Sequence, residues 1–252
     1  VGIVNSQDVT LSGGFGSISL GNTAGAGQRM HSRLTAGVPT AEPDGGNIGQ
    51  FYSGDSNTYG STNELGYASN AAGVTFMSNV YEGFSLGINY APNMNETVNG
   101  DGDDAQDNTY TSHQYSDRTE IIVKYDGEFD GIGVTATYGN ITGNAGRRVD
   151  VDYNDANVHT VSLQLRYAGL SVDHRWHDAS DSGLAKNGGA GGNQSNSTCG
   201  KYVSGAFSVG ACRVESDYDP TVTTTNSKEI NTISAGYNLG GGVNSGVVFF
   251  NV

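Results

Sequence analysis

The chain of 252 residues contains 39 Gly, and its 12 Lys and Arg against 26 Asp and Glu give a formal net charge of −14. This charge argues against nucleic-acid binding through phosphate neutralisation, and the lack of a three-residue glycine period excludes collagen. No stretch approaches the ~18 consecutive apolar residues of a membrane-spanning helix, but a membrane β-barrel needs only ~9–11 alternating residues per strand. Composition therefore leaves a β-barrel open as a way of crossing a membrane.

Apolar residues recur along the chain with a period of two, which is typical of β-strands, and helical periodicity is nearly absent. Phe84, Leu86, Ile88 and Tyr90, for example, alternate with small or polar residues. In chain order this pattern predicts strands at residues 8–12, 15–21, 73–79, 84–91, 119–126, 132–139, 158–168, 170–177, 199–204, 207–214, 229–238 and 243–251. The expected fold is all-β and antiparallel, with about 12 strands in this chain.

The predicted connections alternate between two lengths. Short turns are expected at 13–14, 80–83, 127–131, 168–169, 205–206 and 239–242, and long loops at 22–72, 92–118, 140–157, 178–198 and 215–228. Short turns at one end and long loops at the other are typical of a transmembrane β-barrel, and a soluble sandwich has no need of this order. We therefore predict one barrel domain over residues 1–252, with its apolar face toward lipid, its small polar face toward a lumen, and residues 22–72 as a long insertion.

Aromatic residues stand at the ends of the predicted strands. Those before short turns are Tyr125, Tyr167 and Tyr237, and those before long loops are Tyr90, Tyr138 and Trp176. This placement predicts an aromatic girdle at each membrane interface. The alternative explanation is that Tyr is simply a favourable strand residue.

The two cysteines are equidistant from the predicted turn at residues 205–206. Cys199 and Cys212 should therefore face each other across this hairpin, and an oxidising compartment would allow a disulfide between them. Two unpaired thiols are the alternative.

Five segments resemble a known family: VTLSGGFGSISLGNT (9–23), GVTFMSNVYEGFSLGINYAP (73–92), IIVKYDGEFDGIGVTATYG (121–139), VSLQLRYAGLSVDHRW (161–176) and ISAGYNLGGGV (233–243). They resemble Gram-negative outer-membrane porins of the general-diffusion type, with features of the alphaproteobacterial branch. The resemblance implies an outer-membrane location and a homotrimer. It also implies that the insertion at 22–72 is the third external loop, which folds into the barrel and narrows the pore.

The chain departs from the family pattern at both ends. Family members usually have sixteen strands and close on an aromatic residue, whereas this chain ends in FFNV, with two predicted strands instead of five before the insertion. The resemblance therefore implies an incomplete chain that contributes to a 16-stranded barrel. A twelve-stranded barrel is also physically allowed.

A pore needs charges that set a field across its constriction and a polar wall around it. The constriction candidates on the insertion are Arg29, His31, Arg33, Glu42, Asp44 and Asp55, and the candidates on the lumen wall are Lys124, Arg166, Arg175 and Lys201. The resemblance implies that the carboxylates face the basic wall. The alternative for each is a charge that only faces solvent.

Sites of other kinds are poorly supported. The acidic run from Asp101 to Asp107 lacks the carboxylate that would complete an EF-hand loop, so we expect no specific metal site and no cofactor, and at most loosely bound divalent cations at the external loops, bridging to lipopolysaccharide. His174 and His177 are expected on opposite faces of a strand, and no P-loop, G-x-S-x-G or H-E-x-x-H motif is present. We therefore expect no catalytic residues and no enzymatic activity.

The sequence predicts an outer-membrane porin that forms a water-filled channel for passive diffusion of small hydrophilic solutes and ions. Its expected partners are the lipid bilayer, lipopolysaccharide and two further copies of itself, and not nucleic acid. A non-conducting outer-membrane barrel that acts through its long loops as an adhesin or structural anchor is the first alternative. A secreted Gly-rich β-sandwich or solenoid is the second.

Overall fold

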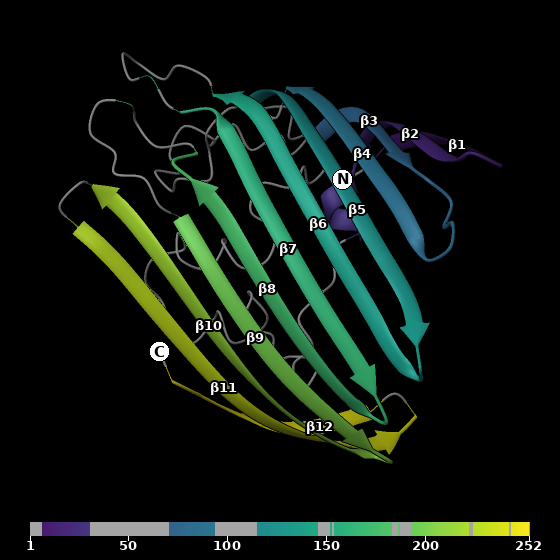
Figure 1. The fold of residues 1–252 in the computed structure, drawn as a ribbon, viewed down its shortest axis with the longest axis vertical. Coiled ribbons are helices and arrows are strands. Elements are labelled where there is room, and N and C mark those ends of the chain that lie inside the picture. The colour runs from purple at the N-terminus through teal and green to yellow at the C-terminus, as the bar shows by residue number, and fades with distance from the viewer. Residues whose placement is uncertain are drawn as a thin grey trace, which may run out of the picture.

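The computed structural model describes residues 7–30, 71–93, 115–145, 152, 154–182, 186, 193–221, 224–241 and 243–251. Within these residues, twelve strands form one antiparallel sheet in which each strand pairs with its neighbours in the chain (Figure 1). They are β1 (Gln7–Gly13), β2 (Gly16–Thr23), β3 (Ala71–Met77), β4 (Phe84–Asn93), β5 (Tyr115–Phe129), β6 (Ile132–Ala145), β7 (Ala156–Tyr167), β8 (Leu170–Ser180), β9 (Asn193–Ser204), β10 (Phe207–Thr221), β11 (Thr224–Gly240) and β12 (Val243–Asn251). The predicted all-β antiparallel fold is confirmed.

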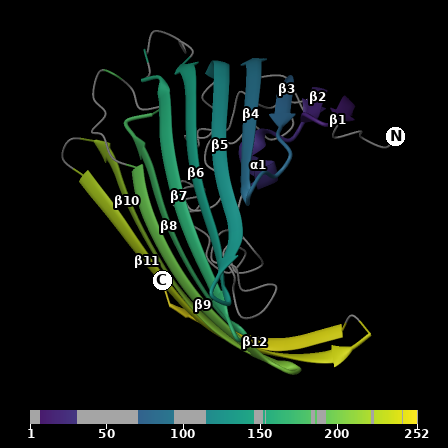
Figure 2. The same ribbon diagram turned by 45° about the vertical axis from the view of Figure 1, so that its right-hand side comes forward.

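The sheet bends into a trough with a concave and a convex face (Figure 2). It is open in the part of the chain that the structure describes, where β1 and β12 are the first and last strands of the order. A single curved sheet is not the two packed sheets of the sandwich alternative.

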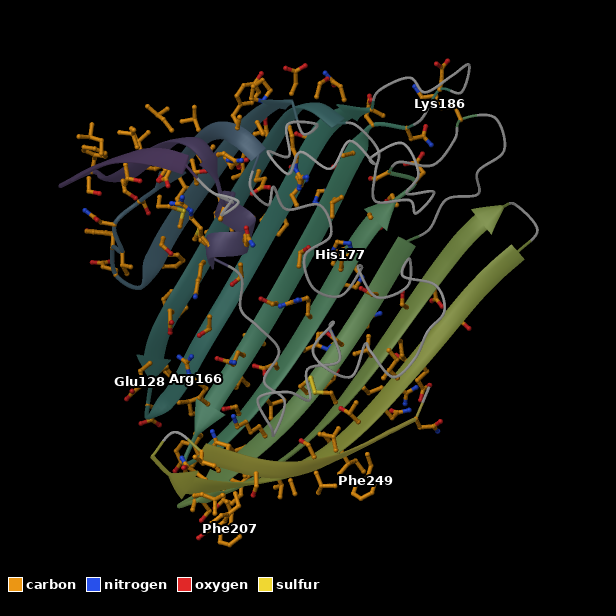
Figure 3. The ribbon with its side chains drawn as sticks, turned by 180° about the vertical axis from the view of Figure 1, so that it is seen from behind. Glu128, Arg166, His177, Lys186, Phe207 and Phe249 are labelled. Atoms are coloured by element: carbon orange, nitrogen blue, oxygen red, sulfur yellow. A yellow bond between two sulfur atoms is a disulfide. The ribbon has the colours of Figure 1, made fainter. Side chains whose placement is uncertain are left out.

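The two faces differ in chemistry as the period-two pattern predicts. Apolar side chains of β7 are 42–44 % exposed on the convex face, at Val161, Leu163 and Leu165. Neighbouring strands continue this surface, and Phe207 and Phe249 lie on it as well (Figure 3). A contiguous exposed apolar surface of this size marks contact with lipid or another apolar partner. The concave face, by contrast, carries mostly small and polar side chains.

Two of the short turns show how the sequence closes its hairpins. Asp130 and Gly131 have φ of 50° and 78°, and Ala168 and Gly169 have φ of 47° and 85°. Two consecutive residues with positive φ match the right-handed twist of the flanking strands, and Asp-Gly is a favoured pair for such a turn. Because β5 runs on to Phe129, the expected connection 127–131 shortens to these two residues.

The strands extend further at their other ends than the apolar pattern predicts. The loop expected at 215–228 is wrong, because β10 runs to Thr221 and pairs with β11 down to Thr224. Backbone hydrogen bonds continue here although outward residues such as Glu215 and Glu229 are charged. Alternation of apolar residues marks only the part of a strand that lies against lipid, so it misses a polar extension beyond it.

One short helix, α1 (Ala26–Met30), follows β2 on the concave side of the sheet (Figure 2). Ala26 and Met30 are buried against Ile122 of β5, with Met77 of β3 packed beside them. No helix in the described part of the chain has the length and apolar character needed to cross a membrane.

Candidate pore wall and constriction

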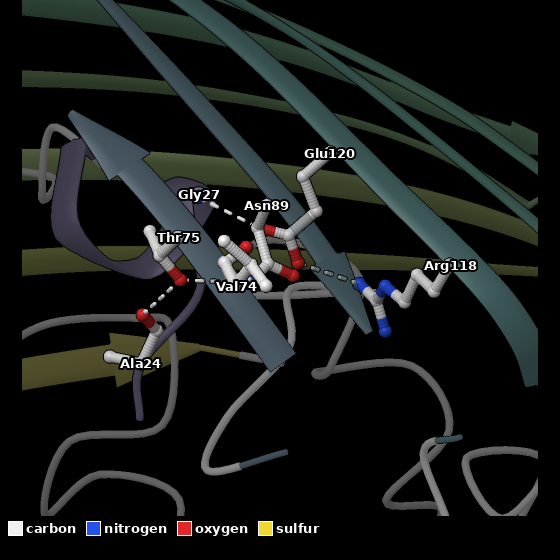
Figure 4. Close-up of polar contacts among 7 residues, drawn as sticks. All are labelled: Ala24, Gly27, Val74, Thr75, Asn89, Arg118 and Glu120. Carbon is white, nitrogen blue, oxygen red and sulfur yellow. Dashed lines mark hydrogen bonds and ion pairs between the residues drawn. The ribbon is translucent and has the colours of Figure 1, made fainter. Parts of the chain in front are cut away.

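The root of the insertion is fixed to the concave face by buried polar contacts (Figure 4). The fully buried Glu120 of β5 accepts a hydrogen bond from the backbone N–H of Gly27, at 2.9 Å from its Oε2. The other oxygen of this carboxylate lies 3.4 Å from the guanidinium of Arg118, which is also buried. Because a buried carboxylate is costly without such partners, these contacts hold α1 and β5 together.

A second set of contacts ties the chain just before α1 to the same wall. The Thr75 hydroxyl donates to the carbonyl oxygen of Ala24 at 3.4 Å and accepts from the Asn89 amide at 2.8 Å. Arg29 donates from Nε to the Ala24 carbonyl at 2.9 Å and from its guanidinium to the Ser19 hydroxyl at 3.2 Å. The predicted constriction residue Arg29 therefore lies on the concave side, turned back toward β2.

Gly87 of β4 makes room for this helix. A Cβ on Gly87 would overlap the Met30 sulfur and lie 3.0 Å from the Ala26 Cβ. The apolar side of α1 therefore rests on a glycine and on Ile122. The lumen face was expected to be small and polar, and Ile122 shows that this expectation is wrong where the insertion root packs.

The middle of the wall is charged and polar. Arg175 and Asp173 of β8 are buried on the concave face, and the register places Arg175 between Ser162 and Ser197 of the neighbouring strands. The two histidines of this segment do lie on opposite faces. His177 is buried on the concave side with its Nδ1 3.0 Å from the Thr160 hydroxyl.

His174 is exposed on the convex side, and its Nδ1 lies 2.9 Å from the Thr198 hydroxyl. The described residues contain no group of three or more His, Cys, Asp or Glu side chains placed to hold a metal ion.

The wall near the short turns carries charges of both signs. Arg166 of β7 reaches over β6 to Asp126 of β5, with a guanidinium nitrogen 2.9 Å from the carboxylate. It passes across Gly133, where an added Cβ would lie 3.0 Å from the arginine Nε. Figure 3 shows Arg166 next to Glu128 at this end of the sheet. Lys201 of β9 lines the same region.

The cysteines form a disulfide across the β9–β10 hairpin. Cys199 and Cys212 are register partners, their Cα atoms are 4.1 Å apart, and they are bonded. Both are buried on the concave face. The disulfide is the one predicted from the equal distance of the two cysteines to the turn.

The aromatic residues predicted to form girdles are found in two groups. At the short-turn end, Tyr125 packs on Phe84 with ring centroids 4.9 Å apart, and Tyr237 packs on Phe207 at 4.7 Å. Tyr167 is exposed at the same end.

At the long-loop end, Tyr90 and Tyr138 are exposed on the convex face, and the Tyr138 ring stacks on His159 at 6.3 Å. Trp176 lies on this face with intermediate exposure.

The structure brings together only part of the predicted site. All four wall candidates lie on the concave face, as the strand registers show: Lys124, Arg166, Arg175 and Lys201. The remaining constriction candidates lie outside the described residues: His31, Arg33, Glu42, Asp44 and Asp55.

Several charged residues of the wall were not among the candidates that the sequence reasoning named. They are the acidic partners Glu120, Asp126, Glu128 and Asp173, together with Arg118. The alternation of side chains could have identified them, since Glu120 and Asp126 are an even number of residues from Lys124 and therefore lie on the same face of the strand.

The curved antiparallel sheet, with its lipid-type exterior and polar interior, defines the class of transmembrane β-barrels. A family model for Gram-negative porins matches residues 4–249, and the chain belongs to this family. It is accordingly an outer-membrane protein, a channel for passive diffusion, embedded in the membrane and passing small solutes. The family is one of channels and not of enzymes.

Solved porin structures share the fold. An anion-selective porin from Comamonas acidovorans is 14% identical, with a TM-score of 0.57, over 98% of this chain and 67% of that one. A porin refined at 1.8 Å resolution is 18% identical, with a TM-score of 0.58, over 97% and 75%. Salmonella typhi OmpF in complex with daunomycin is 17% identical, with a TM-score of 0.55, over 93% and 66%. A search of curated protein sequences gave no match.

Proposed function

We propose that the concave face lines a water-filled path in which the insertion at residues 22–72 forms the narrowest part. The observation that carries this proposal is the position of α1, the start of the insertion, which docks on the concave face through Glu120 and Ile122. The first described residues of the insertion, through α1, thus lie on the inside of the trough and not on its exterior. The adhesin alternative, which needs loops that project outward, is not favoured.

The wall charges support a transverse field at this constriction. Arg175 lies at mid-wall on β8, and Lys124, on the same face, belongs to β5. In the proposal these cations face Glu42, Asp44 and Asp55 of the insertion. Charges of opposite sign on two sides of a narrow aqueous path orient dipolar solutes and select among ions.

We further propose a homotrimer that binds lipopolysaccharide through divalent cations at its external loops and carries out no catalysis. The net charge of −14 favours cations over anions in the channel. Measurement of the reversal potential in a KCl gradient tests this preference, and a potential of the sign for anion selectivity would refute it.

Reconstitution of the purified chain tests the main proposal. In planar bilayers we expect stepwise conductance, and in liposomes we expect swelling with small sugars at a rate that falls with sugar size. A convex-face variant such as Leu163→Ile should conduct like the wild type. Correctly folded protein that gives neither conductance steps nor swelling would refute a channel and favour a non-conducting barrel.

A further inference from the structure

Five residues of neighbouring strands form one row across the concave face near the short turns. The register pairs Glu128 with Gly133, Gly133 with Arg166, Arg166 with Ser171, and Ser171 with Lys201. Paired strands lie about 4.8 Å apart, so every second residue of the row is about 10 Å from the next along the sheet. The row therefore begins with a carboxylate, continues with a guanidinium and ends with an ammonium group, with a glycine and a serine between them.

A cavity of about 690 Å³ lies over this row. All five residues of the row line it, together with Asp126 and the turn residues around Gly169. Small residues keep it open: Gly133 has no side chain to fill it, and Ser171 contributes only a hydroxyl. The cavity thus lies at the short-turn mouth of the channel, separate from the insertion root, and Tyr167, Leu170 and Val203 line it beside the charged groups.

The charged side chains of this cavity differ in whether they already have ion-pair partners. Arg166 is engaged by Asp126 at 2.9 Å and by the Gln164 side chain at 2.9 Å. Lys201 and Glu128 form no ion pair with any other residue in the part of the chain that the structure describes. The Arg166–Asp126 pair therefore lies between the carboxylate of Glu128 and the ammonium group of Lys201, which are both available to a ligand.

We propose that this cavity is a binding site for small zwitterions, in particular peptides of two or three residues, on their way through the channel. The peptide carboxylate binds Lys201 and the Ser171 hydroxyl beside Arg166, and the peptide ammonium group binds Glu128. Glu128 and Ser171 lie three strand spacings, about 14 Å, apart along the row, and a chain of three residues at about 3.3–3.6 Å per residue spans about 10 Å. A hydrogen bond of about 3 Å at each end extends this reach to about 16 Å, and Lys201 is the register partner of Ser171 on the next strand. This inference rests on the proposed channel, because it assigns a class of solute to it.

Charge balance favours a zwitterion over a simple ion. The cavity holds two carboxylates, Asp126 and Glu128, and two cations, Arg166 and Lys201. A monovalent anion gains one available partner and is repelled by Glu128, whereas a ligand with both charges engages both ends. Since exposed ion pairs are individually weak, two of them supply a dissociation constant on the order of tens of millimolar, as suits a solute in transit.

Ligand-observed NMR titration of triglycine against the full chain in detergent micelles tests the site without requiring conduction. We expect saturable binding of triglycine and none of its uncharged analogue, N-acetyltriglycine amide. Lys201→Gln and Glu128→Gln should each weaken binding by about threefold or more, a change of the size that one exposed ion pair supplies. Lys186→Gln, which removes a cation outside the cavity and at the opposite end of the molecule (Figure 3), should bind as the wild type does.

Equal binding of triglycine and the uncharged analogue would overturn the proposal, as would unchanged binding in both cavity variants or no binding at all. Conductance of the same preparations in KCl separates the two levels of the argument. A protein that conducts but does not distinguish triglycine from its analogue refutes the zwitterion site alone. A folded protein that does not conduct refutes the channel.

Discussion

The substitution Glu120→Gln should weaken the contact between α1 and the wall by removing one ion pair. The glutamine keeps an oxygen that can accept from the Gly27 N–H but removes the charge that lies 3.4 Å from the Arg118 guanidinium. Both side chains are at most 4 % exposed, so solvent compensates little. Removal of one partner of a buried ion pair costs about 3–5 kcal/mol, and we take the lower end because the hydrogen bond survives.

Trypsin cleavage after Arg29 reports this cost, because the residue lies inside α1 and a helical backbone does not fit a protease cleft until it opens. When opening is fast relative to cleavage, the rate follows the population of the open form. A loss of about 3 kcal/mol raises that population about a hundredfold at 1.4 kcal/mol per factor of ten. We expect Glu120→Gln to increase cleavage at the Arg29–Met30 bond accordingly, as measured by mass spectrometry of timed digests.

Two further variants distinguish this reasoning from general destabilisation. Glu128→Gln lies on the same strand and face but does not contact α1, and its cleavage rate should match that of the wild type. The double variant Arg118→Gln/Glu120→Gln removes both charges, so it should be cleaved more slowly than Glu120→Gln alone. A change of less than about threefold in Glu120→Gln, or an equal change in Glu128→Gln, would show that the buried carboxylate does not hold the insertion root.

Three other predictions concern the wall. Leu163→Arg, on the convex face, should lower the free energy of unfolding by about 2–4 kcal/mol at the bilayer midplane and lower the folded yield in liposomes. Gln164→Arg, at the inward neighbour, should fold like the wild type. Equal yields of the two variants would show that the convex face does not contact lipid. The double variant Cys199→Ser/Cys212→Ser should still fold, because the strand ladder keeps the register. It should unfold at a lower temperature, measured as the temperature at which gel mobility shifts from the folded to the unfolded form, because a disulfide that closes a loop of this length (sequence separation 13) contributes about 3 kcal/mol to stability. Trp176, the one tryptophan of the chain, should be quenched more by quenchers at the lipid headgroups than by those at the bilayer centre, and the reverse order would contradict the outer girdle.

The period-two pattern predicted the strands well because one physical constraint acts on every residue of a membrane strand. Outward side chains of the lipid-facing segments must suit lipid and most inward ones are small or polar, Ile122 being an exception, so Val161, Leu163 and Leu165 are recognisable without knowledge of their neighbours. The same regularity placed Cys199 opposite Cys212, since register in a hairpin follows from the turn alone. Predictions of face and register, which depend on this repeated rule, were therefore successful, whereas the strand ends beyond the lipid-facing part were missed.

What the sequence could not provide are contacts made across strands that are not adjacent. Arg166 reaches Asp126 two strands away only because Gly133 lies between them, and no local pattern relates these three positions. The buried Glu120 likewise meets Gly27 across a separation of 93 residues. Parity alone places each of these residues on the concave face, but it does not identify its partner.

The two charged clusters of the wall differ in a way that separates structural from functional charge. At the insertion root, Glu120 is fully buried, with one oxygen hydrogen-bonded to the Gly27 N–H of α1 and the other in an ion pair with Arg118, so its charge serves to hold the chain in place. At the short-turn mouth, Lys201 and Glu128 line an open cavity, so their charges remain available to a solute. Neutralising the first kind should therefore alter protease sensitivity and channel noise, whereas neutralising the second should alter only what the channel binds.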